Sequence, residues 1–295
     1  MNSPSAPFAK PQAATIRNAM TIDVEDYFQV SAFAPHIARD SWPARECRVE
    51  ANMDRILGIL DAGQVRATFF TLGWIAERYP ALVRRIVAGG HELASHGYGH
   101  LRASDQDRTQ FMDDISRSKA ILEDIGGQAV LGYRAPSFSI GAANLWALDT
   151  LREAGYRYSS SIYPIRHDHY GMPDAPRFAF YPNGPDGLLE LPITTVRLMQ
   201  RNLPAGGGGY FRLLPYALSR WMMEHVNRTD GQAAIFYFHP WELDPGQPRP
   251  DGLGWKTRFR HYVNLERMEG RIQALTRDFA WERMDRLFLE PPCAR

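Results

Sequence analysis

The chain of 295 residues is poor in cysteine and has no long apolar run. Its two cysteines, Cys47 and Cys293, lie far apart in the sequence, which excludes both a disulfide framework and a cysteine-based metal knuckle. No stretch approaches the roughly 18 apolar residues that a membrane-spanning helix requires. Residues 1–20 also lack the apolar segment of a secretory signal, so we expect a cytoplasmic protein without a transmembrane segment.

An excess of charge of either sign is lacking as well. Lys and Arg together number 34 against 33 Asp and Glu, which gives a net charge of +1. Only Lys10, Lys119 and Lys256 are lysines, and the arginines are scattered along the chain, so the sequence indicates no nucleic-acid partner. Apolar residues make up 44% and charged residues 23% of the chain, values typical of a folded globular protein.

Short β-type runs alternate with amphipathic helical stretches over most of the chain. The expected strands are residues 19–23, 67–72, 91–95, 130–133, 188–191 and 233–238. The expected helices are residues 51–60, a stretch that begins at residue 80, and residues 105–125, 142–154, 216–226 and 264–276. This alternation predicts an α/β fold with parallel strands, and a closed or nearly closed (β/α) barrel fits better than a doubly wound sheet.

The pattern is accounted for by a single domain at residues 19–285, between an Ala-, Pro- and Ser-rich arm at 1–18 and a tail at 286–295. Residues 159–209 are rich in Pro, Gly and Asp and are predicted to form an irregular insertion, and residues 240–285 a C-terminal extension. The four glycines at 206–209 are interpreted as a flexible loop, because Phe211 stands where a phosphate-binding fingerprint needs its third glycine.

Polar residues stand at the points where three of the apolar β-runs end. They are Asp23, Glu25 and Asp26 after the first run, His96 and His100 after the third, and His239 after the last. Because the carboxyl ends of parallel strands meet at one mouth of a barrel, we expect these side chains to converge there. Arg134 follows another strand and is expected to pair with one of the carboxylates and keep it ionised.

Each of these groups also has an ordinary structural interpretation. Acidic clusters after strands often cap helices, and a histidine before proline is more often buried and hydrogen-bonded than catalytic. Their conjunction favours chemistry, since two imidazoles and one carboxylate are the ligand set of a catalytic zinc with an open position. The acid and the histidine left over are what a metal-dependent hydrolase needs as base and acid.

These segments together resemble the polysaccharide deacetylases of carbohydrate esterase family four, the NodB-homology group, over about residues 20–280. Residues 21–26 (TIDVED) correspond to the family's Thr-Phe-Asp-Asp, and residues 96–100 (HGYGH) to its His-(Ser/Thr)-x-x-His. Residues 134–137 (RAPS) correspond to Arg-x-Pro-Tyr, and residues 236–239 (FYFH) to Leu-x-Leu-His. The segments DVEDYFQVSAF, FYFHPWELDPGQPR and RFRHYVNLERME look like the exosortase-associated branch, whose members are encoded with exopolysaccharide biosynthesis genes.

The resemblance implies a single domain with a distorted (β/α)7–8 barrel and a divalent metal ion, Zn²⁺ or another such as Co²⁺, Ni²⁺ or Mn²⁺. Its expected ligands are Glu25, His96 and His100, with Asp26 as the alternative carboxylate. Glu25 is favoured because alternate residues of a strand share a face, so that it would point the same way as Asp23 if the strand continues.

The resemblance also implies the catalytic roles. Asp23 is expected to be the base, with Arg134 as the partner that aligns it, and His239 the acid that protonates the leaving amine. The residues expected at the substrate are Ser137, whose backbone N–H would bind the oxyanion, Pro136 and Trp241. The family's motif with Asp and Trp is not recognisable, and residues 158–161 (YSSS) stand where relatives often carry Asp-Ser-Ser, so the usual acid is missing there.

The expected activity is metal-dependent removal of N-acetyl groups from an amino sugar in a poly- or oligosaccharide, in exopolysaccharide biosynthesis. The expected partner is an N-acetylated glycan, with its linkage to lipid and the oligomeric state of the protein left open. The expected location is the cytoplasm, at the inner face of the membrane with an assembly complex. Two alternatives are hydrolysis of a small cyclic amide or ureide, as in allantoinase-like relatives, and non-catalytic glycan binding.

Overall fold

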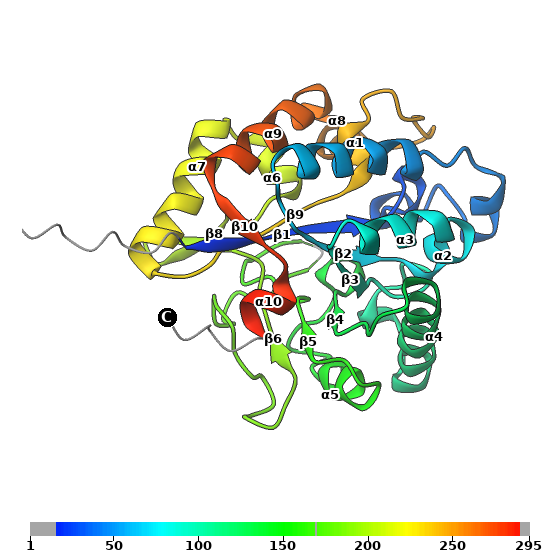
Figure 1. Cartoon of the computed structure of the whole chain (residues 1–295), viewed down its shortest axis with the longest axis horizontal. Helices are drawn as coiled ribbons and strands as arrows, with labels where there is room; N and C mark the ends of the chain where they lie inside the picture. Colours follow the sequence, from blue (N-terminus) through cyan, green and yellow to red (C-terminus); the bar gives the residue numbers. More distant parts are fainter. Residues whose placement is uncertain (1–15, 169, 290–295) are drawn as a thin grey trace, which may run out of the picture.

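The computed structural model describes residues 16–168 and 170–289, which form one α/β domain around a curled sheet (Figure 1). The strands of this sheet are β1 Arg17–Val24, β2 Thr68–Thr71, β3 Glu92–Ser95, β4 Gly132–Tyr133, β5 Tyr158–Ser159, β6 Leu189–Glu190, β9 Ile235–Phe238 and β10 Ala280–Glu282. All of their pairings are parallel. The α/β class and the parallel sheet predicted from the sequence are therefore confirmed.

Helices surround the sheet. They are α1 Val49–Ala62, α2 Gly73–Arg78, α3 Pro80–Ala88, α4 Arg108–Gly126, α5 Trp146–Glu153, α6 Gly208–Leu213, α7 Tyr216–His225, α8 Trp255–Tyr262, α9 Met268–Asp278 and α10 Met284–Phe288. In Figure 1, α1, α7 and α9 lie on one side of β1, and α5 and α10 on the other. None of the helices in the described part of the chain is both long enough and apolar enough to cross a bilayer.

Strand β1 is the centre of the sheet, whose order is β10-β1-β2-β3-β4-β5-β6 with β9 also paired to β1. Residues 17–19 of β1 pair with β10, residues 19–22 with β9 and residues 21–24 with β2. Within the described residues no ladder joins β6 to β9; instead the N–H of Tyr237 in β9 donates to the carbonyl of Gly206 (2.7 Å). The predicted barrel is thus a curled sheet that irregular backbone completes.

The alternation of side chains along β1 separates the core from the site. Met20, Ile22 and Val24 are fully buried in the apolar cluster that includes residues of α1 and α9. Thr21 and Asp23 lie between them in sequence and therefore belong to the opposite face of the strand, toward the interior of the curled sheet. Both are buried, so β1 delivers polar groups to the interior while its other face anchors the helices.

Residues 159–285 are more regular than the sequence suggested. Besides the predicted strand near residue 190, which is β6, the predicted insertion at 159–209 contains an antiparallel hairpin of β7 Thr195–Leu198 and β8 Arg201–Pro204. The predicted extension at 240–285 supplies β10, which pairs with β1. The predicted arm and tail lie largely outside the described residues, although β1 begins at Arg17 and α10 ends at Phe288.

The interpretation of residues 206–209 as a flexible loop is wrong. Gly206, Gly207 and Gly208 are buried, and Gly207 has φ +119°. A Cβ atom on Gly207 would lie 2.0 Å from the carbonyl oxygen of Tyr237. These glycines therefore allow the backbone to approach β9 closely, so glycine is needed here because a larger side chain has no room and not because the segment is flexible.

We predict that Gly207→Ala lowers the free energy of unfolding by at least about 2 kcal/mol, because it combines a backbone conformation open essentially to glycine with a collision against β9. Gly231→Ala is the matched control, since Gly231 also has positive φ (+66°) but a Cβ atom added to it would meet nothing within 4 Å. That control should lose about 1 kcal/mol. Equal losses for the two variants in chemical denaturation would contradict the close approach at Gly207.

Candidate active site

Polar side chains from several strands meet at the carboxyl edge of the sheet. Asp23 lies at the end of β1 and Glu25 just beyond it, while His96, Arg134 and His239 each follow directly after β3, β4 and β9. Parallel strands present their carboxyl ends at one edge, so residues distant in sequence are brought together there. The convergence expected from the sequence is what the structure contains.

Glu25, His96 and His100 form a compact set of potential metal ligands. One ligand atom from each lies within 4.8 Å of the others, and all three side chains are buried. Oε2 of Glu25 lies 2.6 Å from Nε2 of His100 and has no other polar partner among the described residues. A buried carboxylate oxygen of this kind beside two imidazoles fits a four-coordinate zinc that keeps one position open.

The other ring nitrogen of each histidine is occupied. Nδ1 of His96 lies 2.8 Å from the backbone carbonyl of Arg134, which requires the ring to carry its proton on Nδ1. Nδ1 of His100 lies 3.4 Å from Oγ of Ser31. These contacts leave Nε2 of both rings toward Glu25, as is usual for histidines that bind a metal.

Trp241 holds the remaining oxygen of Glu25. Its indole N–H donates to Oε1 of Glu25 (3.0 Å), and its ring is stacked between those of His239 (5.1 Å between centroids) and His261 (4.2 Å). Only 5% of Trp241 is exposed. The sequence placed Trp241 at the substrate, but the structure places it beneath Glu25, where it offers no open ring face to a sugar.

Asp26, the alternative carboxylate, lies outside the ligand cluster. Its Oδ1 accepts the N–H of Tyr27 (2.7 Å) as the cap of a short helical turn, and its Oδ2 accepts the N–H groups of Arg48 (2.5 Å) and Val49 (2.9 Å). These bonds tie the end of β1 to the start of α1. Of the two carboxylates, the geometry therefore favours Glu25 as the ligand.

Arg134 fixes the second carboxylate of the site. Its Nη1 donates to Oδ1 of Asp23 (2.7 Å) and to the hydroxyl of Thr21 (2.7 Å), and the residue is fully buried. Its other nitrogens donate to the carbonyl and hydroxyl oxygens of Ser160 (3.1 and 3.0 Å). With the guanidinium immobilised in this way, Oδ2 of Asp23 is held 3.9 Å from Nε2 of His239.

Electrostatics within the cluster support metal binding. Burial raises the pKa of Glu25, but the neighbouring imidazoles, His100 above all, outweigh it and hold this pKa well below the ordinary range. Burial lowers the pKa of His96 to about 4, and the charge of His100 acts in the same direction. An ionised carboxylate and a neutral imidazole are the protonation states that a metal ion requires.

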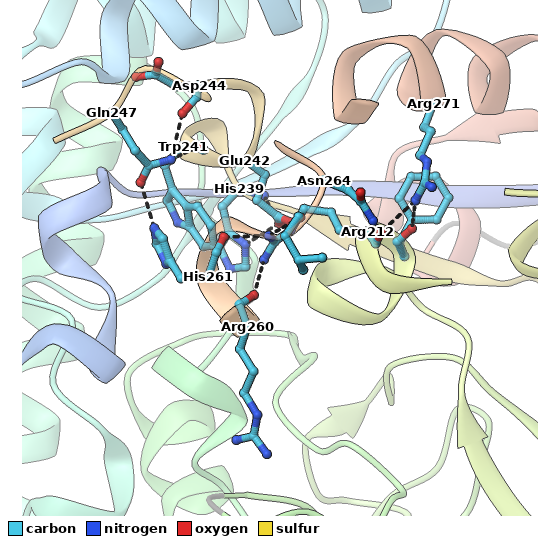
Figure 2. A network of polar contacts seen from close by, with 12 residues as sticks. Arg212, His239, Trp241, Glu242, Asp244, Gln247, Arg260, His261, Asn264 and Arg271 are labelled. Carbon is cyan, nitrogen blue, oxygen red and sulfur yellow. Dashed lines mark hydrogen bonds and ion pairs between the residues drawn. The ribbon is translucent and has the colours of Figure 1, made fainter. Parts of the chain in front are cut away.

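The pKa of His239 is shifted upward, in the opposite direction to that of His96. Burial alone would lower its pKa, but the hydrogen bond to Glu242 and the charges of Glu25, Glu242 and Asp23 raise it to about 9. Nδ1 of His239 lies 2.8 Å from Oε1 of Glu242 (Figure 2). A protonated imidazole at neutral pH can donate a proton to a leaving group.

The backbone around the site adopts unusual conformations. Ser137 and Phe138 have φ of +56° and +50°, and His100 has φ of +52°. Such values are uncommon for residues other than glycine, and each costs free energy that the surrounding structure must offset. Pro136 opens the short turn that contains Ser137, and the hydroxyl of Ser137 donates to that of Ser31 (2.7 Å).

The sequence interpretation missed Glu242 and Arg212. Glu242 stands three residues after His239, which is the spacing of a capping box, and that spacing is a usable signal. Arg212 reaches Glu242 from α6, thirty residues earlier in the chain, and no local pattern indicates this contact.

Two family models match adjoining parts of the chain. Residues 40–159 match the family described as polysaccharide deacetylase, and residues 160–289 match a domain of unknown function (DUF3473). His96, His100 and Arg134 lie in the first match, and His239 and Glu242 in the second. The site is therefore assembled from both parts of the chain.

Curated relatives are similar to a part of the chain. The peptidoglycan-N-acetylglucosamine deacetylase of Bacillus cereus is 32% identical over 103 residues, which are 35% of this chain and 46% of that protein. The peptidoglycan deacetylase of Helicobacter pylori is 28% identical over 113 residues, 38% of each chain. The chain thus spans less than half the length of these relatives.

Solved structures share the fold over almost the whole chain. A Mycobacterium smegmatis protein described as a polysaccharide deacetylase superposes with a TM-score of 0.61 at 21% identity, covering 97% of this chain and 93% of its own. The Puue allantoinase gives a TM-score of 0.55 at 15% identity, covering 91% and 87%. At these identities the likeness concerns the fold.

We predict that Glu25→Gln lowers the affinity for Zn²⁺ by more than about 100-fold, beyond what loss of a supporting contact costs. Asp26→Asn, the matched control one residue along, should keep one zinc per chain and lose only about 1 kcal/mol of unfolding free energy as a weakened cap. Zinc titration of the purified variants measures both. Loss of zinc by Asp26→Asn alone would reverse the assignment of the carboxylate ligand.

Proposed function

We propose that the chain is a member of the polysaccharide deacetylase family, whose model matches residues 40–159, and that it hydrolyses the N-acetyl group of an amino sugar in a poly- or oligosaccharide and releases acetate. The observation that carries the proposal is the arrangement at the strand ends. Glu25, His96 and His100 form a cluster that fits a metal ion. Beside this cluster lie Asp23, whose carboxylate is held by Arg134, and His239, whose Nε2 faces both Asp23 and Glu25. The curated relatives, described as a peptidoglycan-N-acetylglucosamine deacetylase and a chitooligosaccharide deacetylase, support this class of substrate.

Glu25, His96 and His100 would hold the metal ion, Zn²⁺ or another divalent ion such as Co²⁺, Ni²⁺ or Mn²⁺. When bound, such an ion supplies Lewis acidity toward the acetamide oxygen and lowers the pKa of a bound water. Trp241 keeps one oxygen of Glu25 occupied, so that the other is directed at the cluster. Trp241 is therefore proposed to support the ligand set and to act on the substrate only through it.

Asp23 is proposed as the base. Arg134 donates to Oδ1 and holds the carboxylate in place, which leaves Oδ2 to accept a proton from the attacking water. The backbone N–H of Ser137, in the strained turn that Pro136 opens, is proposed to donate to the oxyanion that forms at the acetamide carbonyl.

His239 is proposed as the acid. Its Nε2 lies 3.9 Å from Oδ2 of Asp23 and 3.8 Å from Oε1 of Glu25, so it faces the same space as the base. Breaking the C–N bond leaves electrons on the sugar nitrogen, which takes its proton from Nε2. The products are acetate and a free amino sugar. A role in exopolysaccharide assembly at the inner face of the membrane stays a prediction.

We predict that the purified protein releases acetate from N-acetylglucosamine oligosaccharides, that a chelator abolishes the release and that Zn²⁺ restores it. Asp23→Asn should keep the zinc and lower kcat at least about 100-fold, since it removes the general base. Asp54→Asn, which removes an exposed carboxylate paired with Arg85, is the control and should match the wild type. Wild-type kcat in Asp23→Asn would refute its role.

Ring opening of a small cyclic ureide by the zinc-loaded protein, without acetate from any N-acetylated sugar, would contradict the glycan substrate and support the allantoinase-like alternative. Glycan binding that is unaffected by the chelator, with neither product formed, would contradict the enzymatic proposal altogether.

A further inference from the structure

Glu242 is the residue in closest polar contact with His239, and the proposed reaction gives it no part. Its Oε1 accepts both the backbone N–H of His239 (3.0 Å) and Nδ1–H of the same ring (2.8 Å). Glu242 is completely buried, although it lies in a short helical turn, Pro240–Leu243, directly after the histidine. A buried carboxylate needs compensation by charge and hydrogen bonds.

Arg212 supplies that compensation from the far side. Its Nε donates to Oε2 of Glu242 (2.5 Å), and both side chains are almost wholly buried (2% and 0% exposed). Nη1 donates to the carbonyls of His261 (2.6 Å) and Val263 (3.0 Å), and Nη2 to that of Arg260 (3.1 Å). The guanidinium is therefore fixed to the backbone at the end of α8, as Figure 2 shows.

The backbone that carries Arg212 is itself restrained. Its carbonyl accepts hydrogen bonds from the side chains of Asn264 (2.8 Å) and Arg271 (2.9 Å), so α6 is tied to the region before and within α9 (Figure 2). These hydrogen bonds restrain Arg212, so that its guanidinium fixes the orientation of the Glu242 carboxylate.

We propose that Glu242 and Arg212 are positioning residues that hold the ring of His239 with Nδ1 toward Glu242 and Nε2 toward Asp23 and Glu25. This inference rests on the proposed function of His239 as the acid. A carboxylate that accepts from Nδ1 fixes the proton of the neutral ring at that atom, so only the proton on Nε2 is exchanged with the substrate. Stacking of the ring on Trp241 (5.1 Å, 19° between planes) restricts its tilt.

Glu242 also takes the place of an acidic residue that the sequence lacks elsewhere. Residues 158–161 carry no acid, and Ser160 accepts hydrogen bonds from Arg134. Glu242 provides a carboxylate for His239 from within the same turn, three residues along the chain. Arg212 and Glu242 both lie in residues 160–289, so this part of the chain would contribute to catalysis by positioning His239.

Glu242→Gln separates positioning from a merely structural cap. The carboxylate satisfies three donors with two oxygens: Oε1 accepts the backbone N–H and Nδ1–H of His239, and Oε2 accepts Nε–H of Arg212. An amide has one acceptor oxygen and one NH₂ group, so it can accept from His239 or from Arg212 but not from both, and its NH₂ group then faces the donor on the other side. The shape and volume of the side chain are retained, and the ligands of the metal are untouched.

The test is steady-state kinetics of the zinc-loaded variant on an N-acetylglucosamine oligosaccharide. We expect kcat to fall about 10- to 100-fold, the effect of losing a partner that orients a reacting group, while KM changes less than about twofold. Glu242→Asp, which keeps the charge on a shorter side chain, should recover part of the lost kcat. Asp230→Asn, which breaks the half-buried pair with Arg177, is the control and should keep the wild-type kcat.

A second readout does not depend on activity. In protein labelled with ¹⁵N-histidine, Nδ1–H of His239 should give a hydrogen-bonded, low-field proton resonance. We expect this resonance in the wild type and Asp230→Asn, and we expect its loss or a large upfield shift in Glu242→Gln. If Glu242→Gln does not fold, a shifted resonance in Glu242→Asp provides the same evidence.

The outcomes separate this inference from the proposed function. Wild-type kcat in Glu242→Gln, or an Nδ1–H resonance that neither variant shifts, would overturn the positioning role while leaving deacetylation intact. A wild-type protein that releases no acetate would refute the proposed function. In that case the resonance still decides whether Glu242 orients the ring.

Discussion

The site depends on one buried ion pair, that of Arg134 with Asp23. Arg134 is fully buried, and its guanidinium donates to Thr21 and Asp23 of β1 and to Ser160 after β5, while its carbonyl accepts from His96 after β3. One residue therefore joins β1 to the segments that follow β3 and β5. Removal of either partner would leave an uncompensated charge in the interior, which is costly.

A second ion pair, Arg212 with Glu242, has the same construction on the opposite side of the site. In each pair an arginine, held by hydrogen bonds to oxygen acceptors, fixes the orientation of a carboxylate. Asp23 is proposed to react itself, and Glu242 contacts His239, the proposed acid. Trp241 lies between the two parts, since it is bonded to Glu25 and stacked on His239. The proposed ligand set, base and acid are thus held in place by groups that are themselves fixed by hydrogen bonds, which is the condition for electrostatic catalysis without reorganisation.

The sequence predicts the fold class correctly where local pattern carries the information, and it names several residues that the structure brings close together. Strand ends marked by Asp23, His96 and His239 could be placed because parallel strands share one carboxyl edge. The contacts of Arg212, and the burial of Trp241 under Glu25, could not be predicted, since they depend on how segments distant in sequence pack. The glycines at 206–209 were misinterpreted because sequence alone does not separate a glycine needed for close approach from one in a mobile loop.

The most direct measurement is anomalous diffraction at the zinc edge from crystals of the protein grown with Zn²⁺. We predict one strong peak at bonding distance, about 2.0–2.2 Å, from Oε2 of Glu25 and Nε2 of His96 and His100, with Asp23 and His239 outside that distance. A peak bound by Asp26, or no peak among these residues at saturating zinc, would contradict metal-dependent chemistry at this site.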